Sequence, residues 1–189
     1  MITTTPMTGI ILAGGKSSRM GTDKGLLTFK NLPLVQYCIN ALTPFAATIM
    51  IITANKAYDK FNVPCYADLY PDAGPLGGIH TGLHYSTTEA NFVLSCDTPF
   101  ITGTIIQKIQ DLYQDAKSIT TIVSNEKLMP TIGMYPKSLS PSLTKEIKKG
   151  NLKLTDYVLN QQYQALKLTG QESEMLVNIN TKEEYQKLV

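Results

Sequence analysis

Two glycines and three cations follow a short apolar run near the start of the chain. The run is 10–13, and the residues behind it are Gly14, Gly15, Lys16, Arg19 and Lys24. Such a run indicates a buried parallel strand. Because glycines lack a Cβ atom, a ligand can approach their backbone closely, and their N–H groups can point at phosphate oxygens. The stretch predicts a phosphate-binding loop at the carboxyl end of a first strand, with a tight turn of solvated charges as the alternative.

Two well-known phosphate motifs do not fit this stretch. The P-loop requires Gly, four residues, and then Gly-Lys-Ser/Thr. The tripeptide Gly15-Lys16-Ser17 supplies the end of that motif, but Ile10 stands where its first Gly belongs. The dinucleotide fingerprint G-x-G-x-x-G fails as well, because Lys16 occupies the position of its second Gly. The sequence therefore predicts a nucleotide loop of a different kind.

A further residue that could take part in chemistry, Asp97, follows another apolar run at 91–96. A lone carboxylate at a strand end suits Mg²⁺, which keeps several waters and takes one or two protein carboxylates plus phosphate oxygens. The fixed φ angle of Pro99 restricts the direction of the chain after Asp97. The sequence thus predicts a magnesium ligand on the same rim of the sheet as the glycine loop. The alternative is a carboxylate that only caps the following turn.

Apolar periodicity predicts the elements that must position these residues. Strands are expected at 10–13, 48–53, 63–66, 91–96, 119–123 and 131–135, with extended segments at 163–168 and 175–177. Helices are expected at 33–44, 56–61, from 78 after a Pro-Gly-rich loop at 68–78, around 105–112, at 139–147 and 154–159, and after a capping box at Thr181. Because strands and helices alternate, we predict a single domain spanning 1–189, with a three-layer α/β/α architecture around a mixed, mostly parallel sheet.

The composition narrows the class of protein. A net charge of +2 is too small to argue for a nucleic acid or an anionic membrane as partner. The first apolar run is too short for a signal peptide or a membrane span, so we expect a cytoplasmic protein. Cys38, Cys65 and Cys96 are widely spaced and are expected to be reduced thiols in the core. We expect a monomer or a weak oligomer.

The glycine loop also carries a family resemblance. The segment Leu12-Ala13-Gly14-Gly15-x-Ser17-x-Arg19-Met20-Gly21-x-Asp23-Lys24 resembles the signature of the molybdenum cofactor guanylyltransferases, a branch of the nucleotidyltransferase superfamily. Sugar-1-phosphate and terpenoid-precursor members tend to have Ala-Ala-Gly and a Pro before the Lys. The Ala-Gly-Gly and Asp-Lys found here favour the molybdenum branch. The resemblance implies the Rossmann-like nucleotidyltransferase fold.

The resemblance also implies roles for the residues that match the family motifs. The implied catalytic residues are Arg19, Lys24 and Asp97, and the implied nucleotide contacts are Leu12, Ala13, Gly14, Gly15, Lys24, Thr53, Asp68, Gly78 and Asp97. Asp97 would bind the metal together with Asn180 of the Asn-x-Asn-Thr tail, for which an ordinary capping turn is an equal alternative. Thr53 stands where the best-known family form has Asn, although Asn55 lies two residues on. Asp68 is also compatible with a turn residue.

Four further features have less specific interpretations. The segment 72–79 resembles the family's Gly-Pro-Leu-x-Gly segment over the base, and 129–132 lies where the family faces its second substrate. His80 and His84 have zinc-pair spacing but no third ligand, so we interpret them as packed or surface histidines. The cations Lys145, Lys148, Lys149 and Lys153 are interpreted as a solvated helix end, with steering of an anionic pterin phosphate as the alternative.

The resemblance implies a reaction. GMP would be transferred from GTP to the terminal phosphate of molybdopterin, with Mg²⁺ as cofactor and pyrophosphate as leaving group. The implied partners are GTP, molybdopterin and, as candidates, molybdoenzyme maturation proteins. The alternatives are a related transferase that uses CTP or acts on a sugar phosphate, and a non-enzymatic adaptor that keeps the fold.

Overall fold

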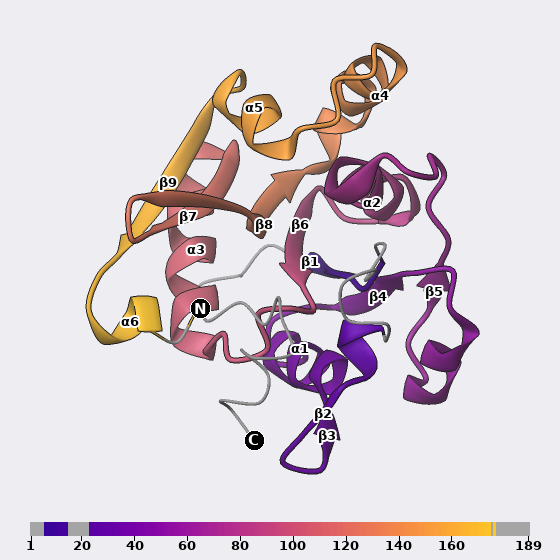
Figure 1. Ribbon diagram of the computed structural model, residues 1–189. Coiled ribbons are helices and arrows are strands. Elements are labelled where there is room, and N and C mark those ends of the chain that lie inside the picture. Colours follow the sequence, from indigo (N-terminus) through magenta and orange to yellow (C-terminus); the bar gives the residue numbers. More distant parts are fainter. Residues whose placement is uncertain (1–5, 15–22, 175, 177–189) are drawn as a thin grey trace.

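A seven-stranded sheet forms the middle of the computed structural model, which describes residues 6–14, 23–174 and 176 (Figure 1). The strand order is β5-β4-β1-β6-β8-β7-β9. The bounds are β1 Met7–Leu12, β4 Thr48–Ile52, β5 Cys65–Tyr66, β6 Ala90–Ser95, β7 Ile119–Ser124, β8 Lys127–Pro136 and β9 Tyr163–Leu168. Strand β8 pairs antiparallel with β6 and β7, whereas the other pairs are parallel. The prediction of a mixed, mostly parallel sheet is confirmed.

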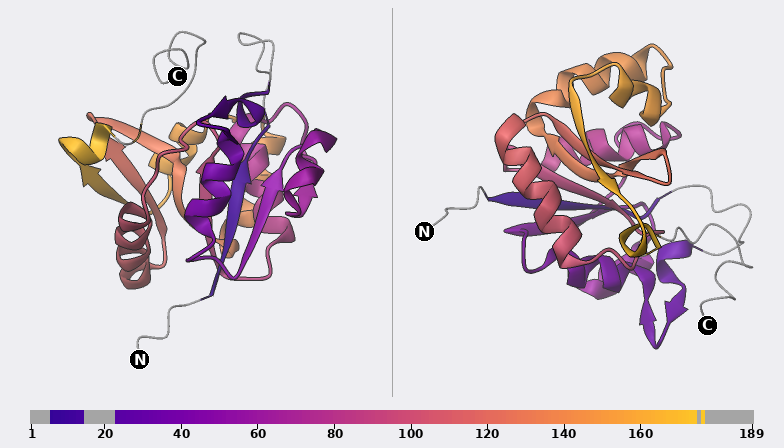
Figure 2. Two further views of the ribbon diagram at one scale, coloured as in Figure 1. Left: turned by 90° about the horizontal axis from the view of Figure 1, so that it is seen from below. Right: turned by 90° about the vertical axis from the view of Figure 1, so that its left-hand side faces the viewer.

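Helices cover both faces of the sheet (Figures 1 and 2). One face carries α1 Leu34–Leu42 and α3 Gly103–Ala116, and the other carries α2 Gly74–Tyr85, α4 Ser140–Lys148 and α5 Leu154–Leu159. Shorter elements are η1 Lys24–Leu26, the hairpin β2 Thr28–Phe29 and β3 Leu32–Pro33, η2 Lys56–Phe61, η3 Lys137–Leu139 and α6 Gln171–Glu174. The three predicted layers are therefore present.

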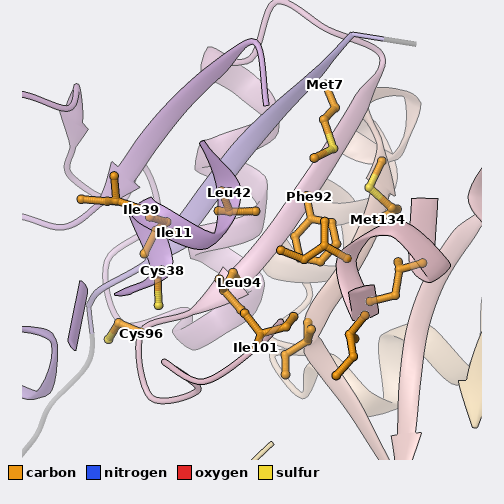
Figure 3. Packing of buried hydrophobic residues seen from close by; sticks show 14 of the residues in the cluster. Met7, Ile11, Cys38, Ile39, Leu42, Phe92, Leu94, Cys96, Ile101 and Met134 are labelled. Carbon is orange, nitrogen blue, oxygen red and sulfur yellow. The ribbon is translucent and has the colours of Figure 1, made fainter. Parts of the chain in front are cut away.

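The alternation of side chains along the strands divides the buried residues into two cores. In β1, Ile11 packs toward α1 and α3, whereas Ile10 and Leu12 pack toward α2. Figure 3 shows the core on the side of α1 and α3, in which Phe92 of β6, Leu42 of α1 and Met134 of β8 belong to one cluster. Because central strands are covered on both faces, they read as continuous apolar runs. That property made β1, β4 and β6 recognisable from the sequence.

Several predicted elements have the bounds that the structure shows. The segment 56–61 is helical, although as a 3-10 helix, and 154–159 and 163–168 are the helix and strand that were expected. Pro33 directly precedes α1, as a fixed φ near −65° suits a helix start. The predicted extended segment 175–177 lies outside the described residues except for Leu176, and so does the capping box at Thr181.

The predicted loop at 68–78 was wrong over its second half. Helix α2 begins at Gly74 rather than at Gly78. Pro75 lies in its first turn, where a missing N–H breaks no intrahelical hydrogen bond. The Gly77 N–H already donates to the Ala73 carbonyl at 3.3 Å. Glycine and proline signalled a loop here, but burial of the helix against the sheet outweighs the low helix propensity of glycine.

Strand β8 is longer than the predicted 131–135 and contains a bulge. Thr121 of β7 pairs with Gly133, whereas the next residue, Ile122, pairs with Met129. The Thr121 hydroxyl lies 2.8 Å from the Met129 carbonyl oxygen and 2.9 Å from that of Ile132, on the two sides of the bulge. The bulge turns Thr131 away from regular pairing.

No helix among the described residues is long and apolar enough to cross a membrane.

The packing of α2 on β1 depends on Gly82. A Cβ atom there would lie 2.5 Å from Cγ2 and 2.7 Å from Cδ1 of the buried, β-branched Ile10. We expect Gly82→Ala to lower the free energy of unfolding by about 1–3 kcal/mol, as overpacking does, although alanine is the better helix former. Urea unfolding measures this loss. In the control Gly103→Ala, the new methyl would meet only the far end of the Phe45 ring, at 3.2 Å, and should cost less. A Gly82→Ala protein as stable as the parent would contradict the packing argument.

Candidate active site

The carboxyl ends of β1 and β6 lie side by side. Leu12 pairs with Ser95, and the Cys96 N–H donates to the Leu12 carbonyl at 3.1 Å. After β1 the chain continues to β4 on one side, and it later returns in β6 on the other. Open α/β sheets bind ligands in the crevice at such a switch point. Gly14, which follows β1, and Asp97, which follows β6, are thereby placed on one rim.

A cavity of about 610 Å³ opens at this rim. It is lined by Leu12, Ala13, Gly14, Asp23, Lys24, Ile52, Asp68, Asp72, Gly74, Pro75, Gly78, Ser95, Cys96, Asp97 and Thr131. Lys24 and Asp97, which are 73 positions apart in the sequence, thus line the same cavity. A cation and a carboxylate facing one space can hold a phosphate ester and a divalent metal together.

The structure brings together most of the predicted site residues that it describes. The predicted residues at the cavity are Leu12, Ala13, Gly14, Lys24, Asp68, Gly78 and Asp97. Thr53 does not line it: this residue is buried, and its hydroxyl accepts a hydrogen bond from the Asn55 N–H at 3.2 Å. Gly15, Arg19 and Asn180 lie outside the described residues, so their roles stay predictions.

Asp68 lies beside three glycines. Cβ atoms added at Gly14, Gly77 and Gly78 would lie 3.7–3.9 Å from its carboxylate oxygens. Its Oδ1 is buried and has no hydrogen-bond partner among the described residues. Burial raises the pKa of Asp68 above its usual value, and a hydrogen bond from Thr81 offsets part of that rise. Asp68 lines the cavity, and a carboxylate in a cavity wall can accept hydrogen bonds from N–H groups of a ligand.

The amino-terminal part of α2 forms another part of the cavity wall, through Gly74, Pro75 and Gly78. A Cβ atom at Gly78 would lie 3.0 Å from Leu12 Cδ2, so this glycine allows α2 to approach the end of β1. The amino end of a helix carries partial positive charge. This end of α2 therefore favours negative groups in the cavity.

The donor set at Asp97 fits a magnesium-type cation. The carboxylate is half-buried at the end of β6, and the described residues contain no cluster of three or more His, Cys, Asp or Glu that could hold a metal. Burial raises the pKa of the neighbouring Cys96 thiol, and the negative charge of Asp97 raises it further. The thiol therefore stays protonated and is a poor metal ligand. One hard oxygen ligand with room for water and phosphate is the arrangement that Mg²⁺ accepts.

Comparison with known proteins identifies the family. The model of the MobA-like NTP transferase domain matches residues 9–164. The chain belongs to this family of nucleotidyltransferases. A "Probable molybdenum cofactor guanylyltransferase" of Flavobacterium johnsoniae is 39% identical over 178 residues, which cover 94% of each chain. One of the same name from Carboxydothermus hydrogenoformans is 32% identical, covering 97% of this chain and 95% of its own.

A solved structure shares the fold of this MobA-like chain. Molybdopterin-guanine dinucleotide biosynthesis protein A from Archaeoglobus fulgidus superimposes with a TM-score of 0.81, covering 96% of each chain at 18% identity. The Rossmann-like nucleotidyltransferase fold that the resemblance implied is thereby confirmed. The residues that the family model matches include every one that lines the cavity.

Some cavity residues were not predicted as site residues from the sequence. Ile52 ends β4, the other neighbour of β1. Because ligands bind at the carboxyl ends of such strands, its place at the cavity could have been predicted. Asp23 and Asp72 lie inside the two recognised motif segments. Thr131 lies in the segment expected to face the second substrate. It lines the cavity and lies within the bulge of β8. Nothing in the sequence pattern signalled that bulge.

The remaining candidates lie away from this cavity. His80 is buried, with Nε2 2.9 Å from the Thr144 hydroxyl, whereas His84 is exposed; both fit the interpretation as packed and surface histidines. None of the lysines at 145–153 lines the cavity. Lys149 pairs with Glu146 at 2.9 Å, and Lys153 pairs with Asp156 at 3.0 Å. These pairs fit a solvated helix end, and the steering of a substrate by the lysines stays untested.

Substituting Asp68 should separate stability from ligand binding. Because burial raises its folded-state pKa, the contribution of Asp68 to stability is present below about pH 4 and is lost as the pH rises through that raised pKa. We expect Asp68→Asn to melt at a higher temperature than the parent at pH 7, with the difference vanishing near pH 3, and to bind nucleotide more weakly. Melting curves across pH measure the first effect. Asp115→Asn, on the exposed surface of α3, controls for the lost charge. A parent that is more stable than Asp68→Asn at pH 7 would contradict the cost of burial.

Proposed function

We propose that this chain transfers GMP from GTP to the terminal phosphate of molybdopterin and releases pyrophosphate. The observation that carries the proposal is that Lys24 and Asp97 line one cavity at the switch point of the sheet. The proposal is further supported by relatives named molybdenum cofactor guanylyltransferases, which match over nearly the whole chain.

The reaction needs little covalent chemistry from the protein. An oxygen of the acceptor phosphate attacks the α-phosphorus of GTP, and the bond from that phosphorus to the bridging oxygen breaks. The acceptor is already a nucleophile, so positioning and charge stabilisation dominate the catalysis. In our proposal, the backbone at Gly14 and the Lys24 ammonium hold the triphosphate. Gly15 and Arg19 are proposed to extend the same cradle.

Asp97 is the residue that we propose to hold the divalent metal, which we take to be Mg²⁺. When bound, such an ion supplies positive charge that neutralises phosphate oxygens. The half-buried Asp97 carboxylate offers hard oxygen ligands, and the cavity around it leaves room for phosphate and water. Asn180 is a proposed further ligand. A binding titration with Mg²⁺ in the presence of GTP, compared between the parent and Asp97→Ala, tests the role of Asp97.

Asp68 supports guanine as the base. The Watson–Crick edge of guanine presents N1–H and an exocyclic amine, two adjacent donors that one ionised carboxylate can accept together. Cytosine presents only one donor group beside an acceptor, so it would leave part of the carboxylate unsatisfied. Asp68 lines the cavity beside Gly78 of α2, so its carboxylate is the group that we propose to make such a contact.

Removal of the metal ligand should abolish most catalysis without unfolding the chain. We expect Asp97→Ala to lose most of its turnover and to keep the melting temperature of the parent, because the residue is half-buried at a strand end. Pyrophosphate release from GTP, with molybdopterin and saturating Mg²⁺, measures the effect. Near-normal turnover under those conditions would refute the metal assignment. Asp115→Asn again controls for the lost charge.

Removal of the cavity lysine should be similarly severe. We expect Lys24→Ala to lower kcat by about 100-fold or more, the scale seen when a preorganised donor to developing charge is removed. The same assay measures it. The control is Lys145→Ala, on the exposed surface of α4, which removes an equal charge far from the cavity lining. Equal activities of the two variants would contradict the role of Lys24.

A nucleotide panel tests the proposed reaction as a whole. The wild-type chain is given molybdopterin, Mg²⁺ and, in turn, GTP, CTP, ATP or UTP, and both pyrophosphate and the dinucleotide product are measured. We expect GTP to be strongly preferred. Preference for CTP would replace the proposed nucleotide. Transfer only to a sugar phosphate would replace the acceptor, and absence of pyrophosphate release with every nucleotide would favour the adaptor alternative.

A further inference from the structure

The side chain of Asp23 joins the loop after β1 to η2. Its Oδ1 accepts a hydrogen bond from the Gly25 N–H at 3.2 Å and another from the Tyr58 hydroxyl. Its Oδ2 accepts one from the Asn55 side-chain amide at 3.1 Å. Tyr58 belongs to η2, which follows β4 in the chain, and Asn55 is the residue that caps the start of η2. The carboxylate is therefore held from both segments.

Tyr58 is a rigid anchor for this contact. The residue is completely buried and belongs to the core that also contains side chains of β1 and α1. Burial raises the pKa of its hydroxyl, with further rises from Cys96 and from the hydrogen bond to Asp23, so the phenol remains protonated and can donate. The Asn55 side chain is fixed as well, because its Oδ1 accepts the Ala57 N–H at 3.0 Å and caps η2.

Gly25 makes the close approach of Tyr58 possible. A Cβ atom at Gly25 would lie 2.4 Å from the Tyr58 hydroxyl oxygen and 3.2 Å from its Cζ. A larger residue would push the ring away from the loop. The two segments are thus connected by hydrogen bonds on Asp23 and by steric fit at Gly25, and Lys24 stands between these two residues.

Lys24 is the part of this arrangement that can act on a substrate. Lys24 and Asp23 line the cavity, whereas Asn55 and Tyr58 do not. The hydrogen bonds from Tyr58 and Asn55 also hold the Asp23 carboxylate oxygens toward η2. A donor whose backbone is fixed before the reaction needs no reorganisation when charge develops, and a misplacement of 1 Å can cost about 100-fold in rate.

We propose that Tyr58 and Asn55 are positioning residues for Lys24 and act through Asp23. The inference rests on the proposed function, since it assumes that Lys24 contacts the nucleotide phosphates. Tyr58 and Asn55 touch no substrate in this account. Their loss should therefore lower kcat more than it raises KM for GTP.

Tyr58→Phe removes the hydroxyl and keeps the ring in the core. We expect kcat to fall by about 10- to 100-fold, with KM for GTP changed less than the turnover. The matched control is Tyr37→Phe, which removes another hydroxyl bond, 2.8 Å long, to the Phe29 carbonyl outside this network. The control should retain the parental kcat. Parental kcat in Tyr58→Phe, or an equal loss in both variants, would overturn the proposal.

The double variant Tyr58→Phe/Lys24→Ala tests whether the effect passes through Lys24. If it does, the double variant should be no slower than Lys24→Ala alone, because the residue being positioned is already gone. Losses that multiply would show that Tyr58 acts by another route and would overturn the proposal. Asn55→Asp gives a second variant at an exposed position: it keeps the cap on η2 but sets a carboxylate against Asp23, and a comparable loss of kcat is expected.

Hydrogen exchange keeps this test separate from the reaction. Amides in the segment 23–27 should exchange faster in Tyr58→Phe and Asn55→Asp than in the parent or in Tyr37→Phe, whichever nucleotide the chain uses. Unchanged exchange in both variants would overturn the positioning role. If the parent transfers no GMP while exchange still rises, the proposed reaction fails and the contact between η2 and the loop stands.

Discussion

The parallel pairing of β1 with β6 and β4 is the constraint on which the site depends. Parallel strands end on the same edge of a sheet, so the pairing of Leu12 with Ser95 places Gly14 and Asp97 on the same edge. The hydrogen bond from Cys96 N–H to the Leu12 carbonyl extends the pairing to the last residue before Asp97. Two segments far apart in the sequence line one cavity because their strands pair, and this pairing satisfies the backbone hydrogen-bond donors and acceptors.

Glycines in α2, which have no side chains, let this helix pack closely on β1 and form part of the cavity wall. Gly78 allows α2 to meet β1, and Gly82 does so one turn later. This approach brings the amino end of α2 and the Asp68 carboxylate to the same space. The burial that makes Asp68 useful also disfavours its charge. Sites that hold a partly desolvated, unsatisfied acceptor commonly give up some stability for function.

The central strands and the rim residues could be predicted from the sequence, because burial on both faces gives continuous apolar runs and strand ends carry the ligand-binding residues. The start of α2 could not, since Gly74 and Pro75 favour a loop locally and only packing against the sheet makes them helical. No pattern in the sequence indicated the bulge between Met129 and Gly133 of β8. Asn55 lies two positions after Thr53, where the best-known family form has Asn. It caps η2 and donates a hydrogen bond to Asp23, and it does not line the cavity.

The central claim is that the metal and the nucleotide occupy one site between the ends of β1 and β6. Paramagnetic broadening by Mn²⁺ in the presence of GTP, read from assigned backbone amides, tests it directly. The account predicts that the amides of Gly14, Gly78 and Asp97 broaden together and recover when Mg²⁺ displaces Mn²⁺. A second hollow of about 710 Å³, lined by Glu146, Lys153 and Tyr157 among others, provides the contrast. Broadening centred there, with the amides at the strand ends unaffected, would contradict the account.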